Sequence, residues 1–272
     1  MMILQNLHTH STFCDGKHTP REMVEFALAK GFSSLGFSSH SCSNRPDRIK
    51  SVWLERNEAY RREVLSLKEE YRGRLDIFLG LEVEAGIDID FTPYDYLIGA
   101  VHLLERNGEY FEVDSSLAIT EDAIARHFGG SPLDYAEAYF RAVAEMPETG
   151  RYDILAHFDL ITKFEEQKHL FDENHPRYVR AALDALDGVE GKIPFFEINT
   201  GAISRGYRTT PYPAMRWLRE FKRRGFGAVI TTDCHNGEWL DCAYEMSAEL
   251  LRSAGFTERF VLTKEGFIPT KL

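Results

Sequence analysis

The feature that most constrains the fold is the regular alternation of short apolar runs with longer amphipathic segments along the 272 residues. Seven runs are typical of strands: 4–10, 34–38, 76–83, 96–102, 154–157, 194–199 and 227–232. An eighth run, 259–263, is weaker. Helices are predicted between them, over about 20–30, 52–71, 133–146, 176–186, 213–224 and 241–254. Strands that alternate with helices are parallel and are joined by right-handed crossovers.

Seven parallel strands in a chain of this length favour a closed barrel over an open sheet. The alternative, a doubly wound sheet, would carry a glycine-rich phosphate loop after its first strand, and neither GxGxxG nor GxxxxGK[ST] occurs in the sequence. There is no internal repeat, low-complexity tract or linker. We therefore expect a single α/β domain over residues 1–272.

The helix starts carry recognisable signals. Thr19 is a good N-cap, Pro20 follows at the first helical position and Glu22 completes a capping box, while Gly31 marks the stop. The apolar residues of this segment fall on one face. The first helix is therefore expected to begin at Pro20 and to pack against the strands.

Composition narrows the function classes. With 43% hydrophobic and 28% charged residues the chain is of ordinary globular composition. The longest stretch without a charged residue, 31–44, is too short for a membrane helix, and residues 1–14 lack the basic start of a signal peptide. Four cysteines without a CxxC motif indicate reduced thiols and a cytoplasmic protein. A formal charge of −11 disfavours nucleic-acid binding, and no pattern predicts an oligomeric state.

Residue types that bind metals fall at or just past the ends of the predicted strands. They are His8, His10, Asp15, His40, Glu82, His102, His157, Asp233 and His235. In a parallel barrel the carboxyl ends of all strands open on one face, where active sites are built. Side chains more than 200 positions apart in the sequence would meet there.

The spacing of these residues supports metal binding. His8-x-His10 places two imidazoles on one side of a strand, because side chains alternate, and Asp233-x-His235 repeats this geometry. Imidazole and carboxylate ligands without thiolate suit Zn, Fe or Mn. Nine ligands exceed the three or four that one tetrahedral ion needs. Two or three divalent ions are therefore predicted.

The segment His8-Thr9-His10-Ser11-Thr12-Phe13-Cys14-Asp15-Gly16 resembles the first motif of the polymerase-and-histidinol-phosphatase (PHP) superfamily. His40, Glu82, His102, His157 and Asp233-Cys234-His235 match its later motifs in order, over nearly the whole chain. The chain most resembles the monofunctional histidinol-phosphate phosphatases. One departure is Ser39, where the family often has Asp before the histidine of the second strand.

This resemblance implies a distorted (β/α)7, TIM-like barrel that holds three divalent ions. The first ion would be bound by His8, His10, Glu82 and Asp233. The second would share Glu82 and add His102 and His157. The third would be bound by Asp15, His40 and His235. Among these residues, Glu82, Asp233 and His235 are expected to be catalytic.

Hydrolysis of a phosphate monoester needs a nucleophile at neutral pH, and a hydroxide bridging two ions would supply it, because metal binding lowers the pKa of water. Three divalent ions against three carboxylates leave a local formal charge of about +3 to attract phosphate. Arg205 and Arg208, which follow the sixth strand, are the expected phosphate donors, with Lys163 a weaker candidate. The identity of the general acid stays open: it could be a metal-bound water, Asp233 or a non-ligating histidine.

The resemblance further implies that L-histidinol phosphate, an intermediate of histidine biosynthesis, is the substrate. The family keeps a substrate-facing acidic residue in the loop over 105–114, so Asp114 is expected to bind the substrate's amine or imidazole. Whether the loop 41–48 forms a lid stays open. Three alternatives remain: a phosphoesterase for another small monoester (a nucleotide or sugar phosphate), a metal-dependent amidohydrolase, and an inert barrel.

Overall fold

The computed structural model describes residues 4–41, 50–87 and 90–272, without the side chains of 50–55. Seven strands form one sheet in which every neighbouring pair is parallel. In sheet order they are β1 (Gln5–Asn6), β2 (Ser34–His40), β3 (Asp76–Glu84), β4 (Tyr96–Ala100), β7 (Ile154–Leu155), β8 (Phe195–Asn199) and β9 (Gly227–Thr231). Each predicted strand has a counterpart.

The sheet curves until its two edge strands meet. Just beyond β1 and β9, Thr9 and Cys234 form an isolated parallel bridge. The backbone N–H of His10 donates to the Cys234 carbonyl at 2.9 Å, and the N–H of Cys234 donates to the His8 carbonyl at 2.9 Å. We call this junction the barrel seam. It makes the sheet a nearly closed, TIM-like (β/α)7 barrel and confirms the predicted fold.

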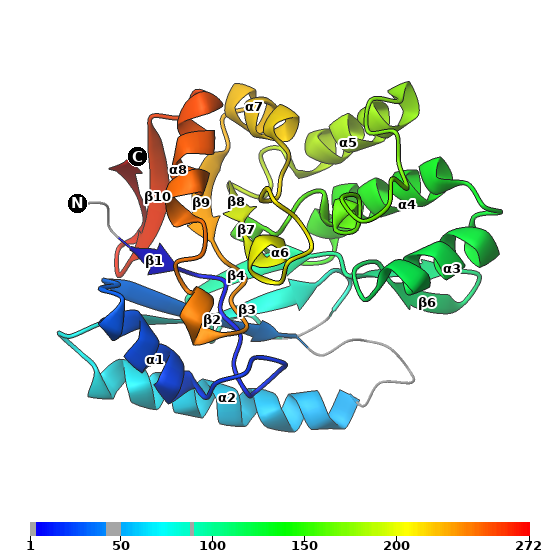
Figure 1. The fold of residues 1–272 in the computed structure, drawn as a ribbon. Coiled ribbons are helices and arrows are strands. Elements are labelled where there is room, and N and C mark those ends of the chain that lie inside the picture. The colour runs from blue at the N-terminus through cyan, green and yellow to red at the C-terminus, as the bar shows by residue number, and fades with distance from the viewer. Residues whose placement is uncertain (1–3, 42–49, 88–89) are drawn as a thin grey trace.

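Helices surround the strands (Figure 1). Along one side lie α1 (Pro20–Ala29) and α2 (Lys50–Glu70), and on the others α3 (Leu117–His127), α4 (Pro132–Glu145), α5 (Pro176–Val189), α7 (Met215–Arg223) and α8 (Tyr244–Ser253). Short helical turns are η1 (Met146–Glu148), η2 (Leu160–Thr162), α6 (Gly201–Ser204) and η3 (Gly237–Trp239). The Thr19 side chain and Glu22 form the predicted capping box of α1.

The strands present two different faces. On β3, Leu79 and Leu81 belong to the large apolar core between strands and helices, whereas Phe78 belongs to a smaller apolar cluster inside the barrel. Tyr96 of β4 joins this inner cluster, and its hydroxyl lies within hydrogen-bond distance of the carbonyls of Leu7 and Phe37. Side chains alternate along a strand, so Glu82 lies on the inner face, above Phe78. The inner cluster therefore forms the floor beneath the charged end of the barrel.

Three features depart from the sequence prediction. The run 259–263 is indeed a strand, β10 (Glu258–Thr263), but it pairs antiparallel with β11 (Gly266–Lys271) outside the barrel sheet. A hairpin of β5 (Leu103–Arg106) and β6 (Glu109–Glu112) follows β4. Helix α3 was not predicted. The two hairpin strands have four residues each and half of these are polar, so apolar periodicity gives little sign of them.

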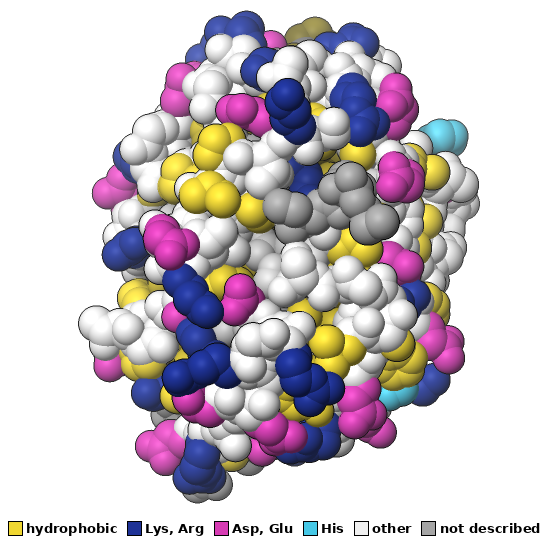
Figure 2. Space-filling view, turned by 90° about the vertical axis from the view of Figure 1, so that its left-hand side faces the viewer, with side chains coloured by type: hydrophobic (Ala, Val, Ile, Leu, Met, Phe, Trp, Pro, Cys, Tyr) yellow, Lys and Arg dark blue, Asp and Glu magenta, His cyan; other side chains and the backbone are white. Residues whose placement is uncertain are grey.

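The surface carries mixed charges. On the side of the molecule where β10 lies, lysine and arginine side chains are interspersed with aspartate and glutamate (Figure 2). No helix within the described ranges has the length and apolar character that crossing a bilayer would require.

Candidate metal centre

All nine predicted ligands converge at one end of the barrel. His8 and His10 follow β1, His40 is the last residue of β2, and Glu82 lies near the end of β3. The others follow β4, β7 and β9 or, for Asp15, lie in the loop after β1. Their ligand atoms form three groups, each within 4.8 Å: His10, Asp15, His40 and His235; His8, His10 and Asp233; Glu82, His102 and His157.

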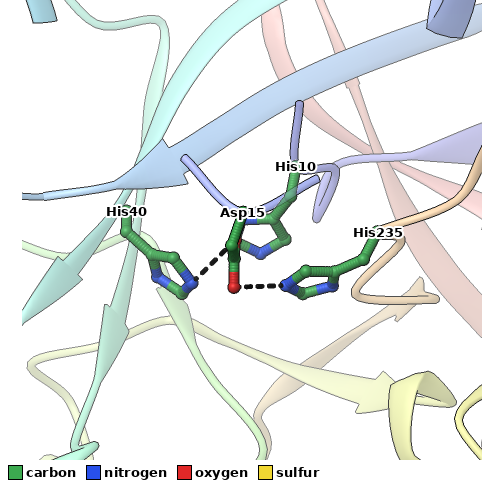
Figure 3. A group of neighbouring side chains, drawn as sticks. All are labelled: His10, Asp15, His40 and His235. Carbon is green, nitrogen blue, oxygen red and sulfur yellow. Dashed lines mark ion pairs between the residues drawn. The ribbon is translucent and has the colours of Figure 1, made fainter. Parts of the chain in front are cut away.

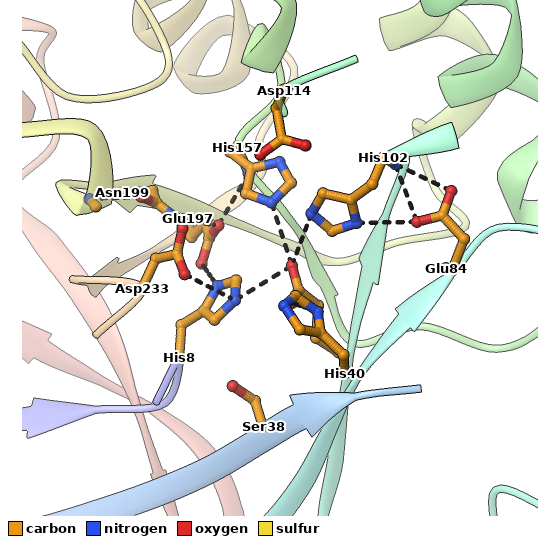
Figure 4. A network of polar contacts seen from close by, with 12 residues as sticks. His8, Ser38, His40, Glu84, His102, Asp114, His157, Glu197, Asn199 and Asp233 are labelled. Atoms are coloured by element: carbon orange, nitrogen blue, oxygen red, sulfur yellow. Dashed lines mark hydrogen bonds and ion pairs between the residues drawn. The ribbon is translucent and has the colours of Figure 1, made fainter. Parts of the chain in front are cut away.

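Glu82 is the centre of the arrangement and is 2% exposed. Its Oε1 lies 3.2 Å from the Nε2 of His8, 3.3 Å from that of His102 and 3.2 Å from that of His157. Figure 4 shows these three imidazoles directed at a common centre. Its Oε2 lies 2.7 Å from the Nδ1 of His40 and 3.5 Å from the Nε2 of His10. One carboxylate thus touches all three groups.

Asp15 gathers a second, more exposed set of imidazoles (Figure 3). Its Oδ1 lies 3.5 Å from His40 Nε2, and its Oδ2 lies 3.2 Å from His235 Nε2. Its own side chain is 57% exposed. His10 stacks on His235 with ring centres 4.1 Å apart, and it borders both this set and the Asp233 group. The His10 ring therefore joins two ligand sets that the family resemblance had kept apart.

The donor set fits divalent cations. His8 Nε2 and His10 Nε2 are buried and have no hydrogen-bond partner. Buried polar atoms in proteins are nearly always hydrogen-bonded, so two such ring nitrogens facing the same carboxylates point to a shared partner. Imidazole nitrogens and carboxylate oxygens offer the ligand chemistry of Zn, Fe or Mn. The cluster has the composition and geometry of a divalent-metal site.

Charge accounts for the titration of these groups. Burial lowers the pKa of His8, but the carboxylates of Glu197, Glu82 and Asp233 outweigh it and leave the pKa raised. Burial opposes ionisation of Glu82 as well, yet the surrounding imidazoles hold its pKa well below the usual range. Protonated imidazoles would balance the charge of these carboxylates. Cations would take over that role, because metal binding releases protons from such ligands.

Two further carboxylates contact the cluster and were not predicted. Glu84 Oε2 lies 2.9 Å from His102 Nδ1, and Glu197 Oε2 lies 2.9 Å from His8 Nδ1. Glu84 stands two residues after Glu82, and Glu197 interrupts an otherwise apolar strand. Both were visible in the sequence as acidic residues on strands that should be buried. An acidic residue in a buried strand shows that the carboxylate needs a partner, but it does not indicate which residue that partner is.

A cavity of about 510 Å³ opens above the cluster, and three of the predicted substrate contacts line it. Arg205 donates through Nη2 to Asp233 Oδ2 at 2.9 Å and through Nη1 to His235 Nδ1 at 2.8 Å. Lys163 Nζ donates to the Asp114 carbonyl at 2.6 Å and to its Oδ2 at 3.0 Å. The cavity thus has a cationic group beside Asp233 and an ion pair on its wall.

Arg208 is placed differently from its predicted role. Its guanidinium donates to Thr162 O at 2.8 Å and lies 4.9 Å from the ring centre of Tyr212, and Arg208 is not among the described residues that line the cavity. Ser41 does line the cavity. The rest of the possible lid, 42–48, lies outside the described residues.

Comparison with known proteins agrees with this geometry. The family model described as "PHP domain" matches residues 6–201. A Deinococcus radiodurans protein named "Probable histidinol-phosphatase" is 31% identical over 264 residues, covering 91% of this chain and 92% of its own. The Bacillus subtilis protein named "Histidinol-phosphatase" is 27% identical over 265 residues, covering 89% of this chain and 97% of its own.

A solved structure shares the fold. The crystal structure of histidinol phosphate phosphatase from Lactococcus lactis, complexed with zinc, L-histidinol and phosphate, superposes with a TM-score of 0.75 at 22% sequence identity. The match covers 97% of this chain and 98% of that one. At this identity the likeness concerns the fold.

Proposed function

The chain belongs to the PHP domain family, and from this premise we propose that it hydrolyses L-histidinol phosphate to L-histidinol and phosphate with the help of divalent metal ions. Two curated relatives that match almost their full length carry the name histidinol-phosphatase. The observation that carries the proposal is the convergence of nine imidazole and carboxylate side chains beneath one cavity. The chain is thus a phosphomonoesterase of histidine biosynthesis.

We assign the nine side chains to three ions, each Zn, Fe or Mn. His8, His10, Glu82 and Asp233 would hold the first, Glu82, His102 and His157 the second, and Asp15, His40 and His235 the third. Bound ions would supply a water of lowered pKa and a positive charge at the phosphoryl oxygens. Glu82, which touches every group, would hold the three ions at fixed spacing.

The chain's own residues orient the phosphoryl group. Arg205 stands between Asp233 and His235 and lines the cavity, so its guanidinium is the donor nearest to a phosphate above the cluster. Arginine suits this role because its fork matches the spacing of phosphate oxygens. Asp233 and His235 consequently flank the position of the reacting phosphorus, in keeping with the catalytic role expected for them.

The rest of the substrate is a cation. L-histidinol phosphate carries an ammonium group, and we assign Asp114 on the cavity wall as the carboxylate that binds this group. The ammonium would replace Lys163, which is the present partner of Asp114. Burial opposes the charge of Asp114, but Lys163 and the nearby imidazoles lower its pKa, so the group is an anion at neutral pH. Cys14, Cys234 and Cys242 are free thiols, which suits a cytoplasmic enzyme.

The function is tested by phosphate release. The purified chain, loaded in turn with Zn²⁺, Mn²⁺ or Fe²⁺, is given L-histidinol phosphate, a nucleoside monophosphate and a sugar phosphate. We expect kcat/KM for L-histidinol phosphate to exceed the others by at least about a hundredfold, since a buried ion pair with the substrate is worth a few kcal/mol.

Two variants serve as controls. Glu82→Gln removes the central carboxylate and should abolish phosphate release and lower the bound metal. Glu245→Gln, an equal change at an exposed position of α8, should leave both unchanged. Rapid hydrolysis of another monoester with no release from L-histidinol phosphate would contradict the proposal.

A further inference from the structure

Glu197 is a buried carboxylate for which the proposed mechanism has no use. It is 1% exposed, lies in β8, and accepts four hydrogen bonds. Its Oε1 accepts from the backbone N–H of His157 at 2.9 Å and from Asn199 Nδ2 at 2.7 Å. Its Oε2 accepts from Thr231 Oγ1 at 2.7 Å and lies 2.9 Å from His8 Nδ1. Figure 4 shows it between His8 and His157.

Four partners use the whole accepting capacity of a carboxylate. Each oxygen offers about two lone-pair directions, and each already has two neighbours within hydrogen-bond distance. Glu197 is also absent from the described residues that line the cavity. It therefore has no lone pair left for an ion and no surface for a substrate. Any effect of Glu197 on the reaction has to pass through the groups it holds.

The group it holds most directly is the His8 ring. An ionised carboxylate can only accept, so the contact at 2.9 Å places a hydrogen on His8 Nδ1. In the neutral ring the lone pair then belongs to Nε2. That nitrogen is buried, has no hydrogen-bond partner, and lies 3.2 Å from Glu82 Oε1 and 3.7 Å from Asp233 Oδ1. Glu197 thus selects the tautomer whose free nitrogen faces the cluster.

We propose that Glu197 is a positioning residue for the metal centre: it holds His8 in the Nδ1–H tautomer and so directs Nε2 at the cation bound with Asp233. This inference rests on the proposed function, because it requires the metal centre to form. A carboxylate behind a ligating histidine fixes the ring and makes it a better donor.

The same side chain links two of the three ligand groups. Through Oε2 it holds the ring of His8, which belongs with Asp233, and through Oε1 it holds the backbone of His157, which belongs with Glu82. The remaining partners, Asn199 and Thr231, come from β8 and β9 and fix the carboxylate itself. Displacing Glu197 would therefore loosen two sites at once, without removing a ligand from either.

The test is zinc affinity, measured on the full chain. Wild type and Glu197→Gln are stripped of metal and titrated with Zn²⁺ against a chromophoric chelator. The glutamine has the same shape, and its oxygen can still serve His157 and Asn199. Its amide nitrogen then faces His8 Nδ1, which has to accept, so the ring proton moves to Nε2. We expect at least one zinc equivalent to bind about ten- to a hundredfold more weakly.

The matched control is Thr231→Val, which removes a donor from the same carboxylate oxygen but leaves His8 and Glu197 in contact. It should bind Zn²⁺ within about threefold of wild type, because the tautomer is unchanged. Thermal unfolding of the metal-free proteins checks that both variants fold. Equal zinc affinity of wild type and Glu197→Gln, or an equal loss in both variants, would overturn the inference.

A second measurement does not depend on the folding of Glu197→Gln. In long-range proton–nitrogen spectra of the zinc-loaded wild type, with His8 identified from His8→Asn, Nδ1 should carry the hydrogen. A hydrogen on Nε2 would overturn the inference. A wild-type chain that binds none of Zn²⁺, Mn²⁺ and Fe²⁺ would instead overturn the proposed function, so the two failures are distinguishable.

Discussion

At the scale of single residues, the charged side chains of the cavity wall form ion pairs with one another. Asp114 and Lys163 face each other, and Arg205 is held by Asp233, so each charged group already has a partner before any ligand enters. A phosphate and an ammonium on one small molecule can exchange with both pairs. A monoester without an ammonium group can exchange with only one of these pairs. The wall therefore favours substrates that carry both charges.

The first prediction concerns this selectivity. Asp114→Asn should reduce kcat/KM for L-histidinol phosphate by about ten- to a hundredfold, the worth of one charged hydrogen bond. With 4-nitrophenyl phosphate, which has no ammonium group, kcat/KM should change less than about threefold. The ratio of the two values in steady-state assays is the measurement. An equal loss with both substrates would assign Asp114 a structural role only.

The second prediction concerns pH and Glu165, which is buried in the loop after η2. Burial raises the pKa of Glu165, although its Oε1 accepts from the N–H groups of Leu170 and Phe171 at 2.9 and 3.1 Å. A raised folded-state pKa means that its share of stability is present below pH 4.5 and is lost as pH rises through the raised value. Glu165→Gln keeps the acceptor and removes the titration.

The stability of Glu165→Gln relative to wild type should therefore increase between pH 4.5 and pH 7. Urea unfolding of both proteins at the two pH values measures this difference, and contributions from other titrating groups cancel in it. A constant difference would mean that Glu165 has the same pKa folded and unfolded.

Residue types and spacing were enough to predict which side chains converge at the barrel rim, but not their surroundings. Histidines that recur at strand ends are a clear signal, because few roles other than metal binding place imidazoles there repeatedly. The partners of Arg208, by contrast, depend on how the loop after β8 turns, and Thr162 lies 46 positions away in the sequence. Glu197 could be recognised as unusual, but its four partners come from β8, from β9 and from the segments after β1 and β7. Such contacts follow from packing and not from local pattern.

At the scale of elements, small residues shape the inside of the barrel. Tyr96 of β4 lies over Gly80 of β3 and Gly36 of β2, and a Cβ at either glycine would collide with its ring. These glycines alternate with apolar residues on strands that otherwise favour bulky side chains. The ring of Tyr96 fills the space they leave and closes the floor beneath the metal ligands.

The third prediction follows from this contact. Gly80→Ala should destabilise the fold by about 1–3 kcal/mol, because the added methyl group forces the Tyr96 ring or the strands apart. Gly150→Ala is the control, since its Cβ would come no closer than 3.1 Å to any neighbour, the nearest being the hydroxyl of Tyr152. Urea unfolding is the measurement. An unchanged free energy of unfolding for Gly80→Ala would show that the Tyr96 ring moves aside freely.

Elements with strong periodicity were predicted, and weakly patterned ones were not. The predicted helix over 176–186 corresponds to α5, Pro176–Val189, and the capping box fixed the start of α1 to the residue. The predicted strand over 4–10 is regular only in β1, Gln5–Asn6. Beyond it, the Thr9 carbonyl accepts from the N–H of Ser38 in β2 at 2.9 Å and Thr9 also pairs with Cys234 at the seam, which barrel closure requires. A pattern read along one segment carries no information about that closure.

At the scale of the whole molecule, the metal centre joins segments from nearly the full length of the chain. The nine proposed ligands extend from His8 to His235 and lie at or after the ends of β1, β2, β3, β4, β7 and β9. Ions that bind only the folded barrel stabilise it by mass action. Occupancy of the centre and stability of the fold are therefore coupled.

The fourth prediction measures this coupling. Removing metal with a chelator should lower the Tm by about 5–10 °C, the effect of losing a ligand bound at about a hundred times its Kd. Zn²⁺ added in excess should restore the Tm, and differential scanning calorimetry follows both steps. A protein purified with bound metal whose Tm is unchanged by its removal would show that the ions contribute nothing to folding.

The barrel seam has a consequence for how the enzyme is made. His8 leaves the ribosome early. Asp233, which is proposed to bind the same ion and follows β9, joins it only after residue 233 has been translated and Cys234 has paired with Thr9. A nascent chain that ends before this point carries seven of the nine ligands and an open rim. Hydrolytic competence therefore arrives with the last strand of the sheet, and a prematurely terminated polypeptide would lack it.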